Sequence, residues 1–251
     1  MRRDLRIIVG TVLLAGLWTG RGRVVAAVSA MHTFRVTNVE ISGLESVERG
    51  EVLALMGLTA ETSVWGDLGA WEDRLAGHPL LEKARVRRRI PGTLVVDVVE
   101  RRPVALAPTP TLEPVDREGV LLPLDPAQRR MDLPVLDVRE LPAPGARLLP
   151  TRARVLAGEV ARLLEADTSF QQMVSEVAWG DDNNTLVATW SEPLVEFLLS
   201  PGTPGSRLRQ GLAVLADALA RESEVPPAVI DLRYADQVVV RRNNQRATES
   251  P

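Results

Sequence analysis

Apolar residues follow three different patterns along this chain, and each pattern marks a region of its own. From Ile7 to Trp18 the sequence is continuously apolar. Strand-like alternation and short helical stripes follow each other over residues 34–102. Over residues 103–242 short strand patterns dominate, with two longer helical stripes between them. The sequence therefore predicts an N-terminal apolar segment, a small mixed module and a larger sheet domain.

Three arginines, all within the first six residues of the chain, precede the N-terminal apolar segment. A helix over residues 5–20 would rise about 24 Å, against roughly 30 Å of hydrocarbon, and flanking arginines can snorkel to close the gap. A signal peptide cleaved at Ala30 and a buried soluble helix are the alternatives. Because Ala30 is far from the apolar run and the run has no polar face, we favour one uncleaved span. The preceding arginines indicate a cytoplasmic residue 1–4 tail and an exported C-terminal bulk.

In residues 34–102 the patterns follow the order β-α-α-β-β. Alternating apolar residues from Phe34 predict the first strand, and Ser46 and Asp67 are candidate N-caps of two short helices. ARVRRRI and TLVVDVVE then predict a hairpin across the Pro-Gly pair between them. This order predicts two helices on one face of a three-stranded sheet, with Trp65 and Trp71 as packing anchors.

Residues 103–242 are predicted to form a mostly antiparallel β domain with two helices. Leucines at helical spacing predict helices over Thr151–Ala166 and Ser206–Glu222. SEVAWG, TLVATW and PLVEFLLS are three predicted strands between these helices. The closing IDLRYADQVVVRR predicts a hairpin that completes an antiparallel meander. We interpret the proline-rich APTPTLEP and LPAPGARLLP as loops, residues 21–33 as a stalk and residues 243–251 as a disordered tail.

Composition narrows the possible functions. The net charge of −3 argues against a nucleic-acid-binding protein. The sequence has no cysteine and only two histidines, so thiol catalysis and Cys/His zinc sites are excluded. No nucleophile triad, phosphate-binding glycine loop or calcium loop is found, so we predict no enzyme activity, cofactor or metal. Six arginines over residues 84–102 form the strongest charge cluster, which we interpret as the solvent face of a hairpin.

Several motifs occur in an order that resembles the FtsQ/DivIB family of bacterial cell-division proteins. They are FRVTNVEISG, HPLLEKARVRRRIPGTLVVDVVERRPVA, VDREGVLL, LPVL and VIDLRYADQVVVR. The resemblance extends from the apolar segment to Arg242. It implies a single-pass type II protein of the cytoplasmic membrane, located at the division septum. A POTRA domain and then a β domain would lie outside the membrane.

The resemblance also implies a non-enzymatic scaffold that links early division proteins to septal peptidoglycan synthesis. The implied partners are FtsB/DivIC-like and FtsL-like proteins, with other divisome components possible at the POTRA domain. In the family, the partner adds a strand to the open edge at the last strands. Gln237 stands where relatives often have glycine, and Arg242 where some have an aromatic residue. The residues of this chain that correspond to the family's partner-binding edge are Arg233, Tyr234, Asp236, Gln237, Val239, Arg241 and Arg242.

Two other functions compete with this hypothesis. A POTRA-containing envelope chaperone or transport component would bind unfolded strands, but such proteins usually carry several POTRA copies and a membrane barrel. A secreted hydrolase would need a nucleophile or metal constellation that the sequence does not provide.

Overall fold

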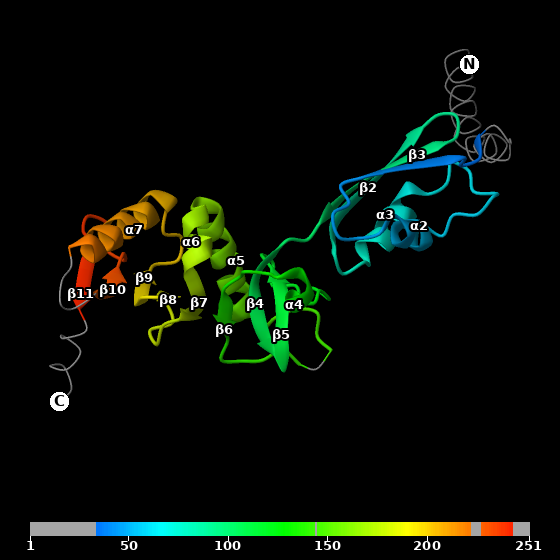
Figure 1. Ribbon diagram of the computed structural model, residues 1–251. Coiled ribbons are helices and arrows are strands. Elements are labelled where there is room, and N and C mark those ends of the chain that lie inside the picture. The colour runs from blue at the N-terminus through cyan, green and yellow to red at the C-terminus, as the bar shows by residue number, and fades with distance from the viewer. Residues whose placement is uncertain (1–33, 144, 222–226, 243–251) are drawn as a thin grey trace, which may run out of the picture. The chain divides into compact units, whose positions relative to one another are not determined.

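The computed structural model describes residues 34–143, 145–221 and 227–242. The chain divides into two compact units between Arg101 and Arg102 (Figure 1). The predicted cytoplasmic tail, span and stalk (residues 1–33) and the predicted C-terminal tail (residues 243–251) lie outside the described residues. Among the helices that are described, none has the length and apolar character needed to cross a bilayer.

The first unit has the predicted β-α-α-β-β order. Its elements are β1 (Asn38–Ser42), α2 (Arg49–Met56), α3 (Leu68–Ala76), β2 (Leu81–Arg89) and β3 (Thr93–Glu100). Strand β3 lies in the middle of the sheet, parallel to β1 and antiparallel to β2. The mixed α+β architecture of this unit is therefore confirmed.

Side chains from both helices and from the central strand form the core of the first unit. Met56 of α2, Leu75 of α3 and Val96 of β3 are fully buried. Asp67 caps α3, accepting a hydrogen bond from the N–H of Ala70 at 3.2 Å. Ser46 does not cap α2, because the helix begins only at Arg49. Ser46 lies in the preceding loop, where its N–H donates to Glu100 Oε2 at 2.8 Å.

The two tryptophans of the first unit have different environments. Trp71 is buried against the core, as predicted. The prediction for Trp65 was wrong, since 38% of this residue is exposed. Its indole packs edge-to-face on Phe34, at 6.1 Å between ring centroids, instead of fixing a helix to the sheet.

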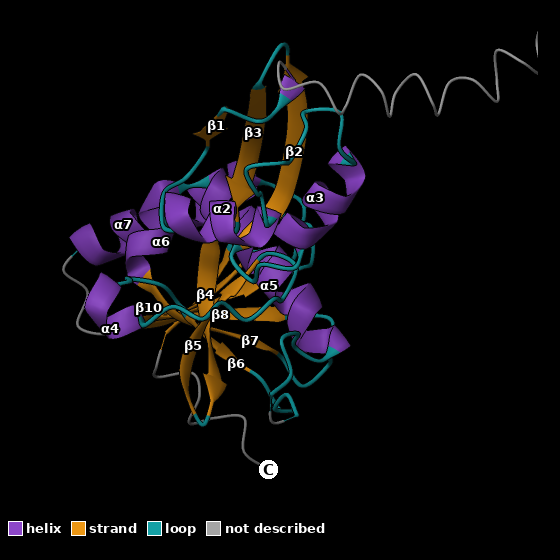
Figure 2. Cartoon of the chain, turned by 90° about the vertical axis from the view of Figure 1, so that its right-hand side faces the viewer, coloured by secondary structure: helices purple, strands orange, loops and turns teal. Residues whose placement is uncertain are grey.

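The second unit is built on one eight-stranded sheet in the order β11-β10-β9-β8-β7-β6-β4-β5. Its strands fan out in Figure 2, as expected for a twisted sheet. The strands are β4 (Pro103–Thr109), β5 (Thr111–Asp116), β6 (Val135–Asp137), β7 (Val174–Trp179), β8 (Leu186–Ser191), β9 (Leu194–Leu199), β10 (Pro227–Asp231) and β11 (Val239–Arg242). The helices are α4 (Pro126–Arg129), α5 (Thr151–Ala166), α6 (Thr168–Met173) and α7 (Gly205–Ala220).

The sheet departs from the predicted antiparallel meander in two ways. Of the seven strand pairings in this sheet among the described residues, β4–β6, β6–β7 and β9–β10 are parallel. Helix α7 carries the chain from β9 to β10, because parallel neighbours need a crossover where antiparallel ones need only a turn. The short helices α4 and α6 were not predicted, so the expectation of two helices was also wrong.

The proline-rich segment APTPTLEP was predicted as a loop but lies largely within β4 and β5, which form a hairpin. Pro114 is tolerated in β5 because β5 is an edge strand, where a missing N–H removes no essential ladder bond.

Helices α5 and α7 lie on the same face of the larger sheet (Figure 1). Leu156 of α5, Leu208 of α7 and Phe197 of β9 belong to one buried cluster. Gly211 allows α7 to approach the end of β10, since an added Cβ would lie 2.6 Å from Leu232 Cδ1. This close packing sets the position of the last two strands, where the candidate site lies.

Candidate partner-binding edge

Strand β11 is the terminal strand of the larger sheet in the described part of the chain. Among the described residues it pairs with β10 alone (Figure 1). The register is antiparallel and places Val239 opposite Asp231 and Val240 opposite Ile230. An edge strand of this kind offers main-chain donors and acceptors to an additional strand.

The register also decides which main-chain groups of β11 face the open edge. The N–H of Leu232 donates to Leu198 O of β9 at 2.8 Å. Main-chain groups alternate in direction along a strand, so those of Asp231 turn towards β11. Val239 lies opposite Asp231, and its N–H therefore points back to β10. The next residue, Val240, presents its N–H and carbonyl to the open edge.

Part of the opposite edge of the same sheet, residues 114–116 of β5, is covered by the chain itself. The N–H of Asp116 donates to Val120 O at 3.0 Å, and the N–H of Leu122 donates to Pro114 O at 2.8 Å. These bonds place residues 120–122 along the outer side of β5. An added strand would have to displace them.

Helix-borne side chains occupy main-chain groups of both edge strands in the first unit. Glu72 of α3 accepts a hydrogen bond from the N–H of Val86 in β2, at 2.8 Å from Oε1. Arg49 of α2 donates to Val39 O in β1. Side-chain cover of this kind protects edge strands from unwanted pairing.

A buried ion pair supports β10 from within. Asp231 has no exposed surface, and Arg233 donates to it from Nε at 2.9 Å and from Nη2 at 2.7 Å. Burial opposes ionisation of Asp231, but the hydrogen bonds from Arg233 outweigh it and hold the pKa of Asp231 below its ordinary value. Arg241 of β11 lies at 3.9 Å from the same carboxylate. The charge of Arg233 is therefore largely neutralised by the buried Asp231 carboxylate.

Arg207, in the first turn of α7, fixes the loop between β10 and β11. It is 9% exposed and donates from Nη2 to Tyr234 O at 2.6 Å and to Gln237 O. Its Nη1 donates to the side-chain oxygen of Gln210 at 2.9 Å. One buried guanidinium thus holds both ends of the bend that leads into β11. Arg207 is not among the site residues predicted from the sequence. A cation in the first turn of a helix opposes the macrodipole, and this was the available signal.

A groove of about 280 Å³ lies beside the open edge, between α7 and β11. Its helix side carries two apolar residues and an ion pair, in which Arg221 Nη2 lies 2.7 Å from Asp217 Oδ2. Val240 reaches the groove from the strand side. The lining residues are Val214, Asp217, Ala218, Arg221, Val240 and Arg242.

The sequence-predicted site residues occupy distinct places around this edge. Tyr234, which is 45% exposed, and the exposed Asp236 and Gln237 lie on the bend between the strands. Val239 and Arg241 belong to β11 and lie on the face opposite the groove, since side chains alternate along a strand. The prediction missed Val240, although its main-chain groups are the ones that face outward.

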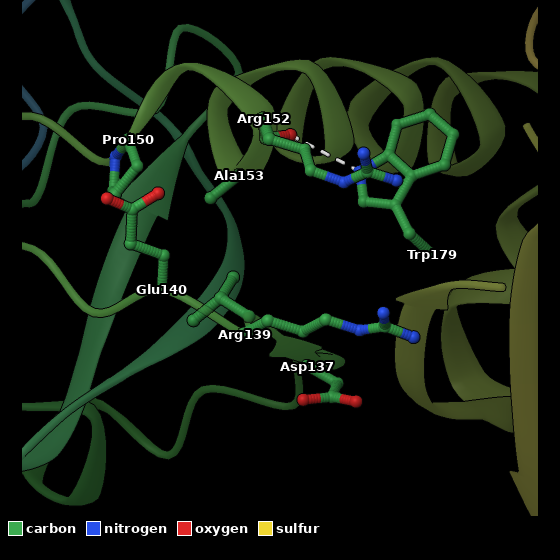
Figure 3. Close-up of a pocket in the computed structure, with 8 residues that line it drawn as sticks. Asp137, Arg139, Glu140, Pro150, Arg152, Ala153 and Trp179 are labelled. Carbon is green, nitrogen blue, oxygen red and sulfur yellow. Dashed lines mark hydrogen bonds between the residues drawn. The ribbon is translucent and has the colours of Figure 1, made fainter. Parts of the chain in front are cut away.

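A second cavity, of about 140 Å³, lies at the end of β6 and the start of α5. Figure 3 shows Arg139 and Arg152 extending along it, with the Arg152 guanidinium beside Trp179. The Arg152 Cζ is 5.2 Å from the ring centroid, and Trp179 Nε1 donates to Arg152 O at 3.3 Å. Four strands separate β6 from β11, so this cavity is not part of the edge.

Arginines of β2 form ion pairs with carboxylates of the other two strands of the smaller sheet. Arg87 pairs with Asp97 at 2.5 Å, and Arg89 pairs with Glu40, on the exposed face of the smaller sheet. Within residues 34–143, 145–221 and 227–242, no three His, Asp or Glu side chains gather as a metal site would require.

Comparison with known proteins identifies the first unit directly. The family model of the FtsQ-type POTRA domain matches residues 34–101. This range contains all five helices and strands of the first unit.

Whole-chain comparison finds relatives named cell division protein FtsQ. The protein of Salinibacter ruber is 30% identical over 260 residues, which cover 96% of this chain and 94% of the relative. The protein of Zymomonas mobilis subsp. mobilis is 31% identical over 185 residues, covering 71% and 55% respectively. That of a Geobacter species is 35% identical over 128 residues, covering 51% and 47%. This chain spans about half the length of the last two relatives and nearly all of the first. It belongs to the FtsQ/DivIB family of bacterial cell-division proteins.

Proposed function

We propose that this protein is a non-enzymatic scaffold of the division machinery, and that a partner chain binds it by adding a β-strand to β11. The observation that carries this proposal is the contrast among the sheet edges. On β1 and β2 a side chain occupies one main-chain group each, and on β5 the chain itself occupies those of Pro114 and Asp116. On β11, Val240 presents its main-chain groups to an edge without a further strand in the described part of the chain.

Membership of the family suggests which partners use this edge. We infer that they are FtsB/DivIC-like and FtsL-like proteins. In strand addition, main-chain hydrogen bonds provide affinity and alternate side chains provide specificity. The groove between α7 and β11 can take an apolar side chain of the added strand, because Val214, Ala218 and Val240 line it. Arg241, which is 49% exposed on the other face, favours an acidic residue in the partner.

The predicted site residues divide into two groups under this proposal. Tyr234, Asp236 and Gln237 are contact residues on the exposed bend, and Val239, Arg241 and Arg242 belong to the receiving strand. Arg233 supports β10 from inside through Asp231. Its replacement would act on the partner indirectly.

The domain arrangement that we infer has a cytoplasmic tail (1–4), a membrane span (5–20) and a stalk (21–33). A POTRA domain (34–102), a β domain (103–242) and a tail (243–251) would follow outside the cytoplasmic membrane. The POTRA domain remains available for other divisome components through its exposed sheet face. Glu72 and Arg49 each occupy one main-chain group of these edge strands, which opposes generic strand capture there.

Localisation and depletion in the native organism test the scaffold role. A fluorescent fusion of the full chain is expected to concentrate at mid-cell, and depletion is expected to give filaments that fail to divide. Affinity purification from membranes should recover FtsB-like and FtsL-like proteins with the wild-type chain. Uniform envelope fluorescence together with normal division after depletion would contradict the proposal.

A further inference from the structure

Three side chains gather where the described part of the first unit begins: Phe34, Trp65 and Arg88. Together with Ile90, the residue that follows β2, we call them the entry cluster. Phe34 and Trp65 pack edge-to-face, with ring centroids 6.1 Å apart. The Arg88 guanidinium lies over the Trp65 ring, 5.7 Å from its centroid. Ile90 follows two residues after Arg88, at the end of β2.

Main-chain and side-chain hydrogen bonds hold the entry cluster in place. The N–H of Val64 donates to Phe34 O at 2.9 Å, which joins the loop that carries Trp65 to the start of the unit. Arg88 donates to Val64 O at 2.6 Å and to Gly66 O at 2.7 Å. The cluster is therefore a preformed surface at one end of the sheet.

The entry cluster leaves apolar surface and positive charge exposed together. Trp65 is 38% exposed and Ile90 is 50% exposed. Among the described residues, the hydrogen-bond partners of Arg88 are carbonyls, so no described carboxylate neutralises its charge. An amphipathic indole beside an arginine is typical of the interface between a bilayer and water.

We propose that the entry cluster lies on the bilayer surface, with Trp65 and Ile90 at headgroup level and Arg88 against lipid phosphates. This inference rests on the proposed span at residues 5–20. The intervening residues 21–33 can extend at most about 45 Å, so the cluster is within reach of the membrane. Contact there would fix the orientation of the POTRA domain on the membrane.

The absence of cysteine from the natural sequence makes a site-specific depth measurement possible. The full chain carrying Ile90→Cys is labelled with a nitroxide and reconstituted into vesicles that contain phosphatidylglycerol. Lys83→Cys is the matched control, because its side chain is 71% exposed and lies near the other end of β2. Vesicle flotation tests the span separately, and collision of the label with oxygen or with a water-soluble nickel chelate tests the cluster.

The proposal expects flotation, increased collision of the Ile90 label with oxygen and decreased collision with the nickel chelate. The Lys83 label should remain accessible to the chelate. Trp65→Glu should return the Ile90 label towards the aqueous values while flotation persists. Vesicles of phosphatidylcholine alone should give a shallower position, because the attraction of Arg88 to net negative lipid is lost.

Three results would overturn the proposal. A floating protein whose Ile90 label remains in water would show that the span is right and the surface contact is wrong. An Ile90 label shielded from both reagents would show that protein covers the cluster. Failure to float would contradict the span itself, and the inference would fall with it.

Discussion

Arg233 binds both carboxylate oxygens of Asp231, with Nε 2.9 Å from Oδ1 and Nη2 2.7 Å from Oδ2. Asp231 is fully buried on β10, directly opposite Val239 of β11. This ion pair connects the interior of the second unit to the strand that we propose as the binding edge. Substitutions in this ion pair should therefore affect both the stability of the second unit and the binding of the partner strand.

Asp231→Asn should destabilise the second unit by roughly 2–4 kcal/mol, because it leaves the Arg233 guanidinium without its carboxylate. Urea unfolding followed by tryptophan fluorescence measures the change. Asp181→Asn is the matched control: it removes the pair with Arg139, in which Asp181 is fully exposed, and should change stability by less than about 0.5 kcal/mol. Equal effects of the two substitutions would show that the buried pair has no special role.

Acid should destabilise both units through identifiable carboxylates. Burial opposes ionisation of Glu100, but the N–H groups of Val47, Glu45 and Ser46 outweigh it and lower its pKa, and Arg233 does the same for Asp231. A folded-state pKa below the unfolded value contributes stability at higher pH, and this contribution is lost as pH falls through the folded pKa. The free energy of unfolding should therefore start to fall near the ordinary values of 4.5 for Glu100 and 3.8 for Asp231, and continue to fall below them.

The Asp231→Asn variant also tests whether Asp231 contributes to the loss of stability in acid. Asp231→Asn removes one of the titrating groups, so its free energy of unfolding should fall less steeply with acid than that of the wild type. Parallel curves for the two proteins would contradict the assignment to Asp231.

Arg207→Gln should loosen the bend between β10 and β11, because it removes the donors to Tyr234 O and Gln237 O. Hydrogen exchange of the amides in residues 233–238 should accelerate at least about tenfold, corresponding to a loss of about 1.4 kcal/mol of local protection. Arg209→Gln, on the exposed side of the same turn of α7, should leave these rates unchanged. Acceleration in both variants, or in neither, would exclude a specific role for Arg207.

Local patterns predicted the elements of this fold better than their pairing. The leucine spacing gave α5 over Thr151–Ala166, and Asp67 marked the start of α3. The direction of β10 was predicted wrongly. Its parallel neighbour β9 is separated from it by helix α7, and the local sequence of a strand does not reveal which distant strand it pairs with. The segment Ala107–Pro114 was predicted wrongly as a loop, and Pro114 shows why: proline suits an edge strand as well as a loop.

The family resemblance predicted where the candidate edge lies, but it did not predict which main-chain groups of β11 face outward. Knowing which amide of β11 faces outward requires the register with β10 and the bond from Leu232 to β9. Those facts select Val240 instead of Val239. Likewise, the contacts of Arg207 with the bend join residues about thirty positions apart, which no periodicity reveals.

The measurement that tests the central claim most directly is binding of the FtsB-like partner to a Val240→Pro variant. Proline removes the outward N–H and its ring obstructs an added strand, while the bonds of Val239 to β10 are not targeted. Leu112→Pro, on β5 at the opposite edge, is the control for inserting proline into an edge of the same sheet. We predict that Val240→Pro weakens binding more than about tenfold with the fold intact by circular dichroism, and that Leu112→Pro binds as the wild type does. Wild-type affinity in a folded Val240→Pro variant would contradict strand addition at β11.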